Sequence, residues 1–182
     1  MQFEKTVPLR GGAPCLLRAA LPEEAAETLA CFLRTHGETD YLLSYPEESG
    51  RSEEKQRAFL KAMLAAPRGA ELCAWVDGHL AGMAGFSCVG ERIKTRHRAE
   101  FGISVEKAYW GRGIGRALTQ ACIALARAAG YRQLELDVVA ENAAAIALYE
   151  SCGFAEYGRN PRGFCRRDGS WQPLVLMRLE FD

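Results

Sequence analysis

Hydrophobic and polar positions follow two different periods along this chain. Over residues 114–128 the apolar positions recur every three or four residues, with Gly130 just beyond, which predicts the clearest helix of the chain. Over residues 133–139 apolar and polar residues alternate, which predicts a strand. Because a helix joins this strand to a preceding one at 98–105, we expect the two strands to be parallel.

Ahead of these elements the pattern predicts one strand, two helices and a hairpin. Pro22 opens the first helix and is followed by acidic residues in its first turn. Asp77 and Gly78 separate two apolar runs, which is the strongest short signal for a hairpin. The predicted segments are a strand at 15–20, helices at 22–35 and 51–66, and hairpin strands at 71–76 and 79–89.

The last forty residues predict a short helix and a closing pair of strands. Asn142 is placed to cap the helix, Gly153 to end it, and Asp168-Gly169 to separate the two strands. The complete order is β-α-α-β-β-β-α-β-α-β-β, which indicates an α/β fold with a mixed central sheet. A length of 182 residues without repeats or linkers predicts a single domain, 1–182.

Charge and composition change this picture little. Hydrophobic residues make up 48% of the chain and charged residues 25%, which is typical of a globular protein. The 23 basic and 23 acidic residues cancel, so no overall field favours nucleic acid or an anionic membrane as a partner. No apolar stretch is long enough for a membrane span, and the first ten residues lack the apolar centre of a secretory signal. A cytoplasmic location is therefore expected.

The seven cysteines are scattered and include no C-x-x-C pair. An odd number without regular spacing predicts neither a disulfide framework nor a zinc site, so no metal is expected. Most of these cysteines are expected to be reduced, small core residues.

A glycine cluster, "GRGIGRAL" at 111–118, stands where the clearest helix begins. Glycines allow close approach of a ligand to the backbone, and the free N–H groups of a helix N-terminus attract phosphate. The kinase and ATPase loop G-x-x-x-x-G-K-[ST] is absent, and the dinucleotide pattern G-x-G-x-x-G fails from either starting glycine. A glycine turn that binds nothing is the remaining alternative on these residues alone.

The segment Trp110 to Gly115 resembles the pyrophosphate-binding motif [QR]-x-x-G-x-[GA] of the GNAT N-acetyltransferase superfamily, with Trp110 where Gln or Arg is usual. A register shifted to 112–117 also fits, but it spoils the phase of the following helix. A second stretch, "ENAAAIALYESCGF" at 141–154, resembles the family signature N-x-x-A-x-x-x-Y-x-x-x-G-F at every fixed position. The element order is also that of the family, and the resemblance is closest to small bacterial amino-acid and alkylamine N-acetyltransferases.

This resemblance implies a GNAT fold in which a splayed strand pair binds acetyl-CoA, the acyl donor. The main chain of Ile103 and Val105 would bind the pantetheine arm, and one of their amides could face the oxyanion. The glycine turn would bind the pyrophosphate mainly through its amides, and Asn142 would contact the cofactor or a water. The cofactor-binding residues implied are Ile103, Val105, Gly111, Arg112, Gly113, Ile114, Gly115, Arg116, Asn142, Ala145 and Tyr149.

Two catalytic residues follow from the same resemblance. Tyr149 would be the general acid, because a phenol stays protonated at neutral pH and can protonate a departing thiolate. Glu100 is the candidate general base, with His97, Glu106 or an ordered water as alternatives. The loop between the first two helices would line the acceptor pocket with Thr39, Asp40, Tyr41 and Tyr45.

The sequence therefore predicts an acetyl-CoA-dependent N-acetyltransferase that acts on a primary amine of a small molecule or an amino acid by direct attack. A non-catalytic acyl-CoA sensor or interaction module on the same fold is an alternative, because both signatures mainly report cofactor binding. A dinucleotide enzyme is a third, weakened by the failed fingerprint. The residues leave open the identity of the acceptor, longer acyl chains and whether the chain forms a homodimer.

Overall fold

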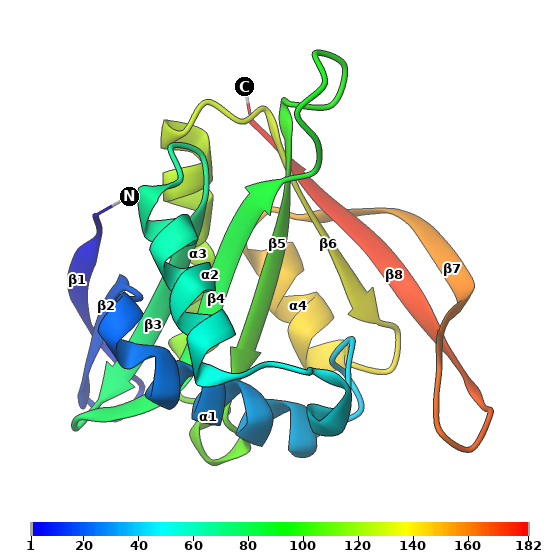
Figure 1. The fold of residues 1–182 in the computed structure, drawn as a ribbon. Helices are drawn as coiled ribbons and strands as arrows, with labels where there is room; N and C mark the ends of the chain where they lie inside the picture. Colours follow the sequence, from blue (N-terminus) through cyan, green and yellow to red (C-terminus); the bar gives the residue numbers. More distant parts are fainter. Residues whose placement is uncertain (1, 182) are drawn as a thin grey trace.

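The computed structural model describes residues 2–181 and folds them around one eight-stranded mixed sheet (Figure 1). The strand order across the sheet is β1-β2-β3-β4-β5-β6-β8-β7. The strands are β1 Glu4–Pro8, β2 Pro14–Ala19, β3 Ala70–Val76, β4 His79–Cys88, β5 Arg98–Val105, β6 Gln133–Val139, β7 Ala155–Cys165 and β8 Trp171–Glu180. The helices are α1 Ala25–Gly37, α2 Glu53–Ala65, α3 Ile114–Ala128 and α4 Ala143–Ser151.

This architecture confirms the predicted fold class and all the predicted elements, with one addition. A strand that the pattern did not indicate, β1, precedes the predicted first strand and pairs with it in antiparallel fashion. Five residues with little apolar alternation carried no strand signal of their own, because β1 is an edge strand whose residues are mostly exposed. The turn that follows uses Gly11 and Gly12, both with positive φ.

The hairpin between β3 and β4 forms as predicted at Asp77 and Gly78. Their φ angles are 50° and 77°, which is the left-handed conformation that a two-residue hairpin turn requires. The two strands are long and almost wholly buried, so this hairpin forms the centre of the sheet.

Helices cover both faces of the sheet. Helices α1 and α2 lie in front of the sheet in Figure 1, and α3 and α4 lie behind it. The side chains between the sheet and the front pair form a small core that includes Cys31, Leu60 and Cys73. The rear core is larger and includes Leu118 of α3 and Leu134 of β6. The sheet therefore separates two compartments.

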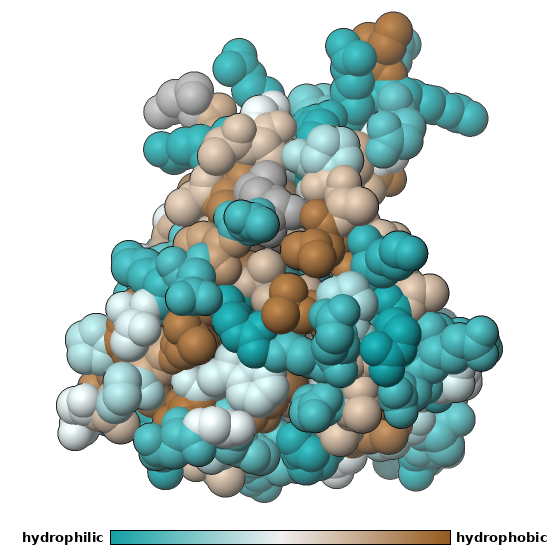
Figure 2. Space-filling model, turned by 60° about the vertical axis from the view of Figure 1, so that its left-hand side comes forward, coloured by the Kyte–Doolittle hydropathy of each residue, from teal (hydrophilic) through white to brown (hydrophobic). Residues whose placement is uncertain are grey.

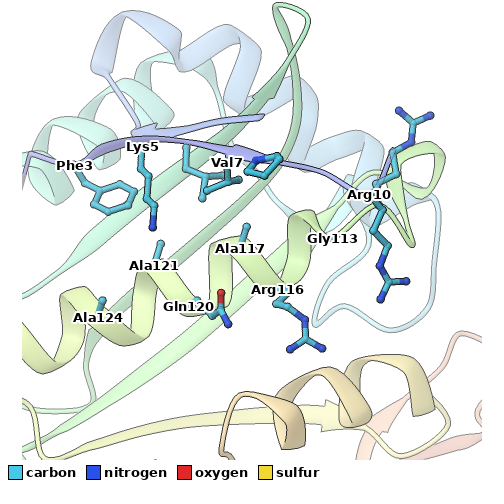
Figure 3. A pocket seen from close by; sticks show the side chains of 13 residues that line it. Phe3, Lys5, Val7, Arg10, Gly113, Arg116, Ala117, Gln120, Ala121 and Ala124 are labelled. Atoms are coloured by element: carbon cyan, nitrogen blue, oxygen red, sulfur yellow. The ribbon is translucent and has the colours of Figure 1, made fainter. Parts of the chain in front are cut away.

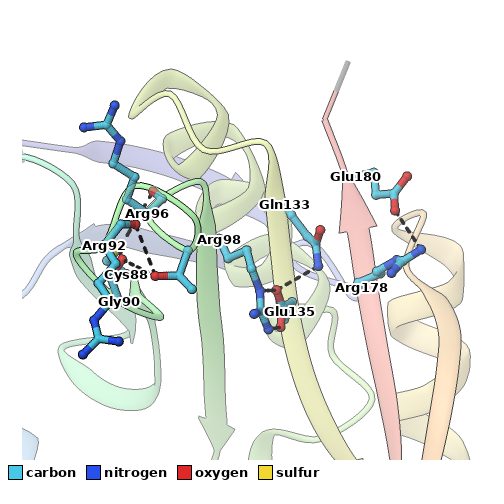
Figure 4. A network of polar contacts seen from close by, with 10 residues as sticks. Cys88, Gly90, Arg92, Arg96, Arg98, Gln133, Glu135, Arg178 and Glu180 are labelled. Atoms are coloured by element: carbon cyan, nitrogen blue, oxygen red, sulfur yellow. Dashed lines mark hydrogen bonds and ion pairs between the residues drawn. The ribbon is translucent and has the colours of Figure 1, made fainter.

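Within residues 2–181, strands β5 and β6 are the only neighbours that run parallel, and they separate after a short contact. Their pairing starts at Arg98 with Gln133 and ends at Glu100 with Glu135, and beyond that point the strands diverge in Figure 1. An ion pair between Arg98 and Glu135, supported by a hydrogen bond of 2.8 Å from Gln133, joins the paired end (Figure 4). The predicted splayed pair is therefore present.

On the face shown in Figure 2, hydrophilic residues surround the exposed hydrophobic ones. Within residues 2–181, no helix combines the length and the apolar character that crossing a membrane requires.

All seven cysteines are free thiols, and Cys15, Cys31, Cys73 and Cys122 are buried, as predicted for small core residues. Burial raises the pKa of each of these four thiols.

Candidate active site

The divergence of β5 and β6 opens a cleft of about 380 Å³ in the middle of the sheet. We call it the central cleft. Backbone groups of β5 that point away from β4 have no strand to bond here, because the pairing with β6 has ended. Five of the predicted site residues line this cleft: Glu100, Ile103, Val105, Asn142 and Tyr149.

The glycine turn lies at the mouth of the same gap, on the α3 and α4 side. Gly111 and Gly113 have φ angles of 76° and 99°, and Gly113 is the N-cap of α3. The first helical hydrogen bond runs from the amide of Ala117 to the carbonyl of Gly113 (3.1 Å), which leaves the preceding amides without a helical partner. They border a second cavity of about 440 Å³, here called the glycine-turn cavity, to which Gly111, Gly113, Ile114, Gly115, Arg116 and Ala145 contribute.

A third cavity of about 370 Å³ adjoins the turn between β1 and α3. Figure 3 shows side chains from β1 and from α3 facing each other across it. Lys5, Arg10, Arg112 and Arg116 line it, and Arg10 and Arg116 also line the glycine-turn cavity. None of these four cations has an acidic partner within residues 2–181. The amide of Arg10 donates to the carbonyl of Arg112 (2.9 Å), so the turn that follows β1 supports the glycine turn and adds charge to it.

Gly115 explains how α4 comes close to the turn. A Cβ atom on Gly115 would lie 3.2 Å from Cδ2 of Leu148 on α4. Asn142 caps α4 by accepting a hydrogen bond from the amide of Ala145 (3.2 Å), as its position predicted. Both helices therefore present their N-terminal ends to the same gap.

Tyr149 lies on the wall of the central cleft and is only 8% exposed. Its ring packs edge-to-face against Phe101 and at 60° to Phe154, with ring centres 6.3 and 5.9 Å away. Burial, with a smaller effect from Cys152, raises the pKa of the Tyr149 phenol above its usual value. The phenol is therefore protonated across the physiological pH range.

The three residues considered as general base occupy different places. Glu100 is exposed on β5 and lines the central cleft. Glu106 is buried and accepts hydrogen bonds from Arg34 (2.6 Å) and His79 (2.8 Å), so it links α1 to the strands. His97 is exposed in the loop between β4 and β5, away from the residues that line the cleft.

Asp137 and Trp110 are among the residues of the cleft that were not predicted as site residues. Asp137 on β6 lines the central cleft, and burial together with the negative charge of Glu135 raises its pKa. Trp110 lines both the central cleft and the glycine-turn cavity, and its indole N–H donates to the carbonyl of Val105 (2.6 Å). Asp137 lies at an alternating position of a predicted strand, which gives no signal of function.

A fourth cavity, of about 370 Å³, lies on the other face of the sheet under α1 and α2. We call it the front cavity. It shares Glu100 and Gly102 with the central cleft. His36 and Glu71, which were not predicted as site residues, also line it. Burial lowers the pKa of His36, and Nδ1 of its ring lies 2.8 Å from the carbonyl of Phe32.

The loop between α1 and α2 divides between two surfaces. Thr39 and Tyr41 line the central cleft. Asp40 and Tyr45 instead line an outer depression, where Arg167 of the β7–β8 turn stacks 3.8 Å from the ring centre of Tyr45 and pairs with Glu47.

Within residues 2–181, no three His, Cys, Asp or Glu side chains are grouped closely enough to hold a metal ion.

A splayed parallel strand pair beside a left-handed glycine turn is the arrangement of an N-acetyltransferase fold. The chain belongs to the acetyltransferase (GNAT) family, whose model matches residues 33–154. Members of this family take the acetyl group from acetyl-CoA.

Individual relatives agree with this assignment. The chain is 31% identical to a GNAT acetyltransferase from Streptococcus pneumoniae, with a TM-score of 0.87 over 92% of this chain and 99% of that one. It is 30% identical over 58% of its length to the L-methionine sulfoximine/L-methionine sulfone acetyltransferase of Salmonella typhimurium, and 50% identical over 42% to the [ribosomal protein bS18]-alanine N-acetyltransferase of Escherichia coli. The matched segments span 61% and 51% of those two relatives.

Proposed function

We propose that this protein is an acetyl-CoA-dependent N-acetyltransferase that acetylates a primary amine of a small molecule or an amino acid. The observation that carries the proposal is the junction of three features at one gap: the left-handed glycine turn, the unpaired edge of β5 and the buried Tyr149. Family membership supports the same chemistry. When bound, acetyl-CoA supplies a thioester whose acyl carbon an amine can attack.

The glycine turn fits the pyrophosphate of CoA. Its amides have no helical partner and open into a cavity, and the positive end of the α3 dipole adds to them. Arg112 and Arg116 add charge from the same turn. Ala145 is one of three alanines through which α4 lines this cavity.

The free edge of β5 would hold the pantetheine arm through main-chain hydrogen bonds. Ile103 and Val105 lie on this edge, beyond the end of the β6 pairing. The carbonyl of Val105 already accepts from the Trp110 indole, so we infer that Trp110 takes part in positioning this edge. A main-chain amide of the same stretch is the donor available to a developing oxyanion.

Tyr149 is the proposed general acid. Its phenol stays protonated because burial raises its pKa, and it lies on the cleft wall where a thiolate would leave. Glu100 is the proposed base, since it lines both the central cleft and the front cavity and so lies between the two substrates. Asn142 is proposed to orient the cofactor or a water beside its capping bond.

We infer that the acceptor is a small molecule and that neither nucleic acid nor a membrane is a partner. The relatives of this chain are named for two kinds of amine, a free amino-acid analogue and the alanine of a ribosomal protein. A screen for the acceptor should therefore include both free amino acids and short peptides. We propose that the enzyme works in the cytoplasm. Size-exclusion chromatography with light scattering would test whether the enzyme forms a homodimer.

Two measurements test the proposed activity. Acetyl-CoA should raise the thermal unfolding temperature of the protein, whereas NAD and ATP should not, because only CoA matches both the glycine turn and the strand edge. In a screen of amines with acetyl-CoA, thiol release should accompany one acceptor class, and mass spectrometry should find the acetylated product.

The outcomes separate the alternatives. Protection by NAD, or no protection by acetyl-CoA, would contradict the cofactor assignment. Protection by acetyl-CoA without thiol release from any amine or peptide would indicate a sensor rather than an enzyme.

A further inference from the structure

The front cavity contains a carboxylate that the proposed reaction does not use. Glu71 on β3 pairs with Gly85 on β4, and Gly85 in turn pairs with Gly102 on β5. These three positions form one row across the sheet. Neighbouring residues in such a row point to the same face, here the face covered by α1 and α2.

The two glycines leave this row without side chains. A Cβ atom on Gly85 would overlap the carboxylate of Glu71, so that carboxylate lies across Gly85, one strand closer to the cleft than its own backbone. Around Gly102 nothing lies within 4 Å of an added Cβ. A groove therefore runs from the Glu71 carboxylate over Gly102, one of the residues that line both the front cavity and the central cleft.

The carboxylate of Glu71 has no hydrogen bond or ion pair within residues 2–181. Arg51 is the cation that influences it. Arg51 lines the same cavity, but its guanidinium is directed at other groups. It lies 4.2 Å from the ring centre of Phe32, 5.8 Å from that of Phe59 and 3.2 Å from Oε1 of Gln56. Glu100 and the neutral ring of His36 are the other titratable groups that line this cavity.

An unpaired carboxylate that lines an open cavity is well suited to a cation. A bound ammonium group would neutralise it. Burial raises the pKa of Glu71 to about 7, because the charge of Arg51 offsets only part of the effect of burial.

We propose that Glu71 binds a second cationic group of the acceptor while the reacting amine lies in the gap between β5 and β6. This inference rests on the proposed acetyltransferase function and names its acceptor class, a short diamine or an amine with a comparable second cation. The carboxylate lies above β4, and the gap begins beyond β5, about 4.8 Å farther across the sheet. Only a short spacer between the two nitrogens therefore fits, and 1,4-diaminobutane is a suitable probe.

Matched acceptors test this assignment. With acetyl-CoA saturating, kcat/KM for 1,4-diaminobutane should exceed that for 1-aminobutane and for 4-amino-1-butanol by about tenfold or more, as expected for a charge-assisted contact. Glu71→Gln should remove this preference by lowering only the diamine value. Gly102→Val should also lower kcat/KM for the diamine, because a side chain there would block the groove. Titration calorimetry of the diamine into CoA-saturated protein gives a second readout that requires no turnover.

The results can fail in distinguishable ways. Equal kcat/KM for the diamine and the monoamines, or an equal loss for all three in folded Glu71→Gln, would overturn the role of Glu71 and leave the acetyltransferase intact. Calorimetry that finds no diamine binding, or equal diamine binding by the parent and by Glu71→Gln, would also overturn the role of Glu71. Failure of acetyl-CoA to bind would overturn the proposed function itself, and a calorimetric titration of the diamine into the protein without CoA would still decide whether Glu71 binds a cation.

Discussion

The two sides of the central cleft are built in different ways. On the α3 and α4 side, the ligand-facing groups are main-chain amides of one short turn, assisted by the cations around it. On the α1 and α2 side, the groups are side chains from α1, α2, β3, β4 and β5, elements far apart in the chain. A backbone site depends on local conformation and appears in the sequence as a motif, whereas a side-chain site depends on register across the sheet and leaves no local pattern.

This contrast has a chemical counterpart. The rear side gathers unpaired positive charge. The front side contains the unpaired carboxylate of Glu71, together with Glu100 and with Arg51, which stacks on Phe32 and Phe59. An anionic cofactor and a cationic acceptor would therefore approach from opposite faces of the sheet and meet where β5 and β6 separate. The following predictions test that division, from the largest expected effect to the smallest.

Tyr149→Phe should have the largest effect, since Tyr149 stands where the two sides meet. Loss of a general acid typically costs about a hundredfold in kcat or more, while the dissociation constant for acetyl-CoA should hardly change. Steady-state kinetics and calorimetry measure the two quantities. Tyr157→Phe, a change of an exposed tyrosine on β7, is the control. A Tyr149→Phe enzyme with parental turnover would rule out the acid role.

Gly113→Val should weaken acetyl-CoA binding by about tenfold or more, because a left-handed φ of 99° costs a branched residue about 1–2 kcal/mol and the turn would relax. An added Cβ would meet nothing within 4 Å, so the loss would come from the backbone. Gly130→Val strains the other end of α3, where φ is 80°, and should lower stability without lowering affinity. Equal affinity losses in the two variants would contradict a site at the turn.

Glu71→Gln should stabilise the protein at pH 8 and leave it unchanged at pH 4. Burial raises the pKa of Glu71 from 4.5 to about 7, so the folded state retains a proton that the unfolded state releases, and parental stability falls as pH rises through this window. The full shift corresponds to about 3 kcal/mol, and we expect about 1–2 because the cavity is open to water.

Urea unfolding at both pH values measures this difference. Glu150→Gln, at an exposed position of α4, is the matched control and should show no pH-dependent gain. A Glu71→Gln protein that is less stable than the parent at pH 8 would mean that the carboxylate is compensated within the fold.

Arg10→Gln should have the smallest effect, about a threefold loss of acetyl-CoA affinity, because an exposed charge contributes little in water. The loss should disappear in 1 M salt, where exposed charges are screened. Arg132→Gln, a change of an exposed residue just before β6, is the control. If Arg10→Gln and Arg132→Gln behave alike, the cations from the N-terminal loop do not contribute to the cofactor side.

The sequence predicted the fold well because each element carries its own signal. The periodicity of α3, the turn at Asp77-Gly78 and the alternation in β6 are local, and the structure follows them closely. Strand β1 was missed because an edge strand with exposed residues need not alternate. Its absence from the prediction also hid the contribution of Arg10 to the glycine turn.

The residues of the candidate site likewise fall into those with a local sequence signal and those without one. The residues of the two motifs come together around the gap, as the resemblance implied. Glu71 could not be identified as a site residue from the sequence. Its place in the cavity depends on the sheet register that puts Gly85 and Gly102 beside it. The same applies to Glu106, whose engagement with Arg34 and His79 depends on residues 72 and 27 positions away.

Trp110 gives the protein an optical signal of its own. Its indole is 46% exposed, lies at the junction of the central cleft and the glycine-turn cavity, and donates to the Val105 carbonyl. A ligand that fills either space must change the polarity around this ring and thus its fluorescence. The residue that departs from the family motif would then report cofactor arrival in real time, with Trp75 and Trp171 as a constant background outside both spaces.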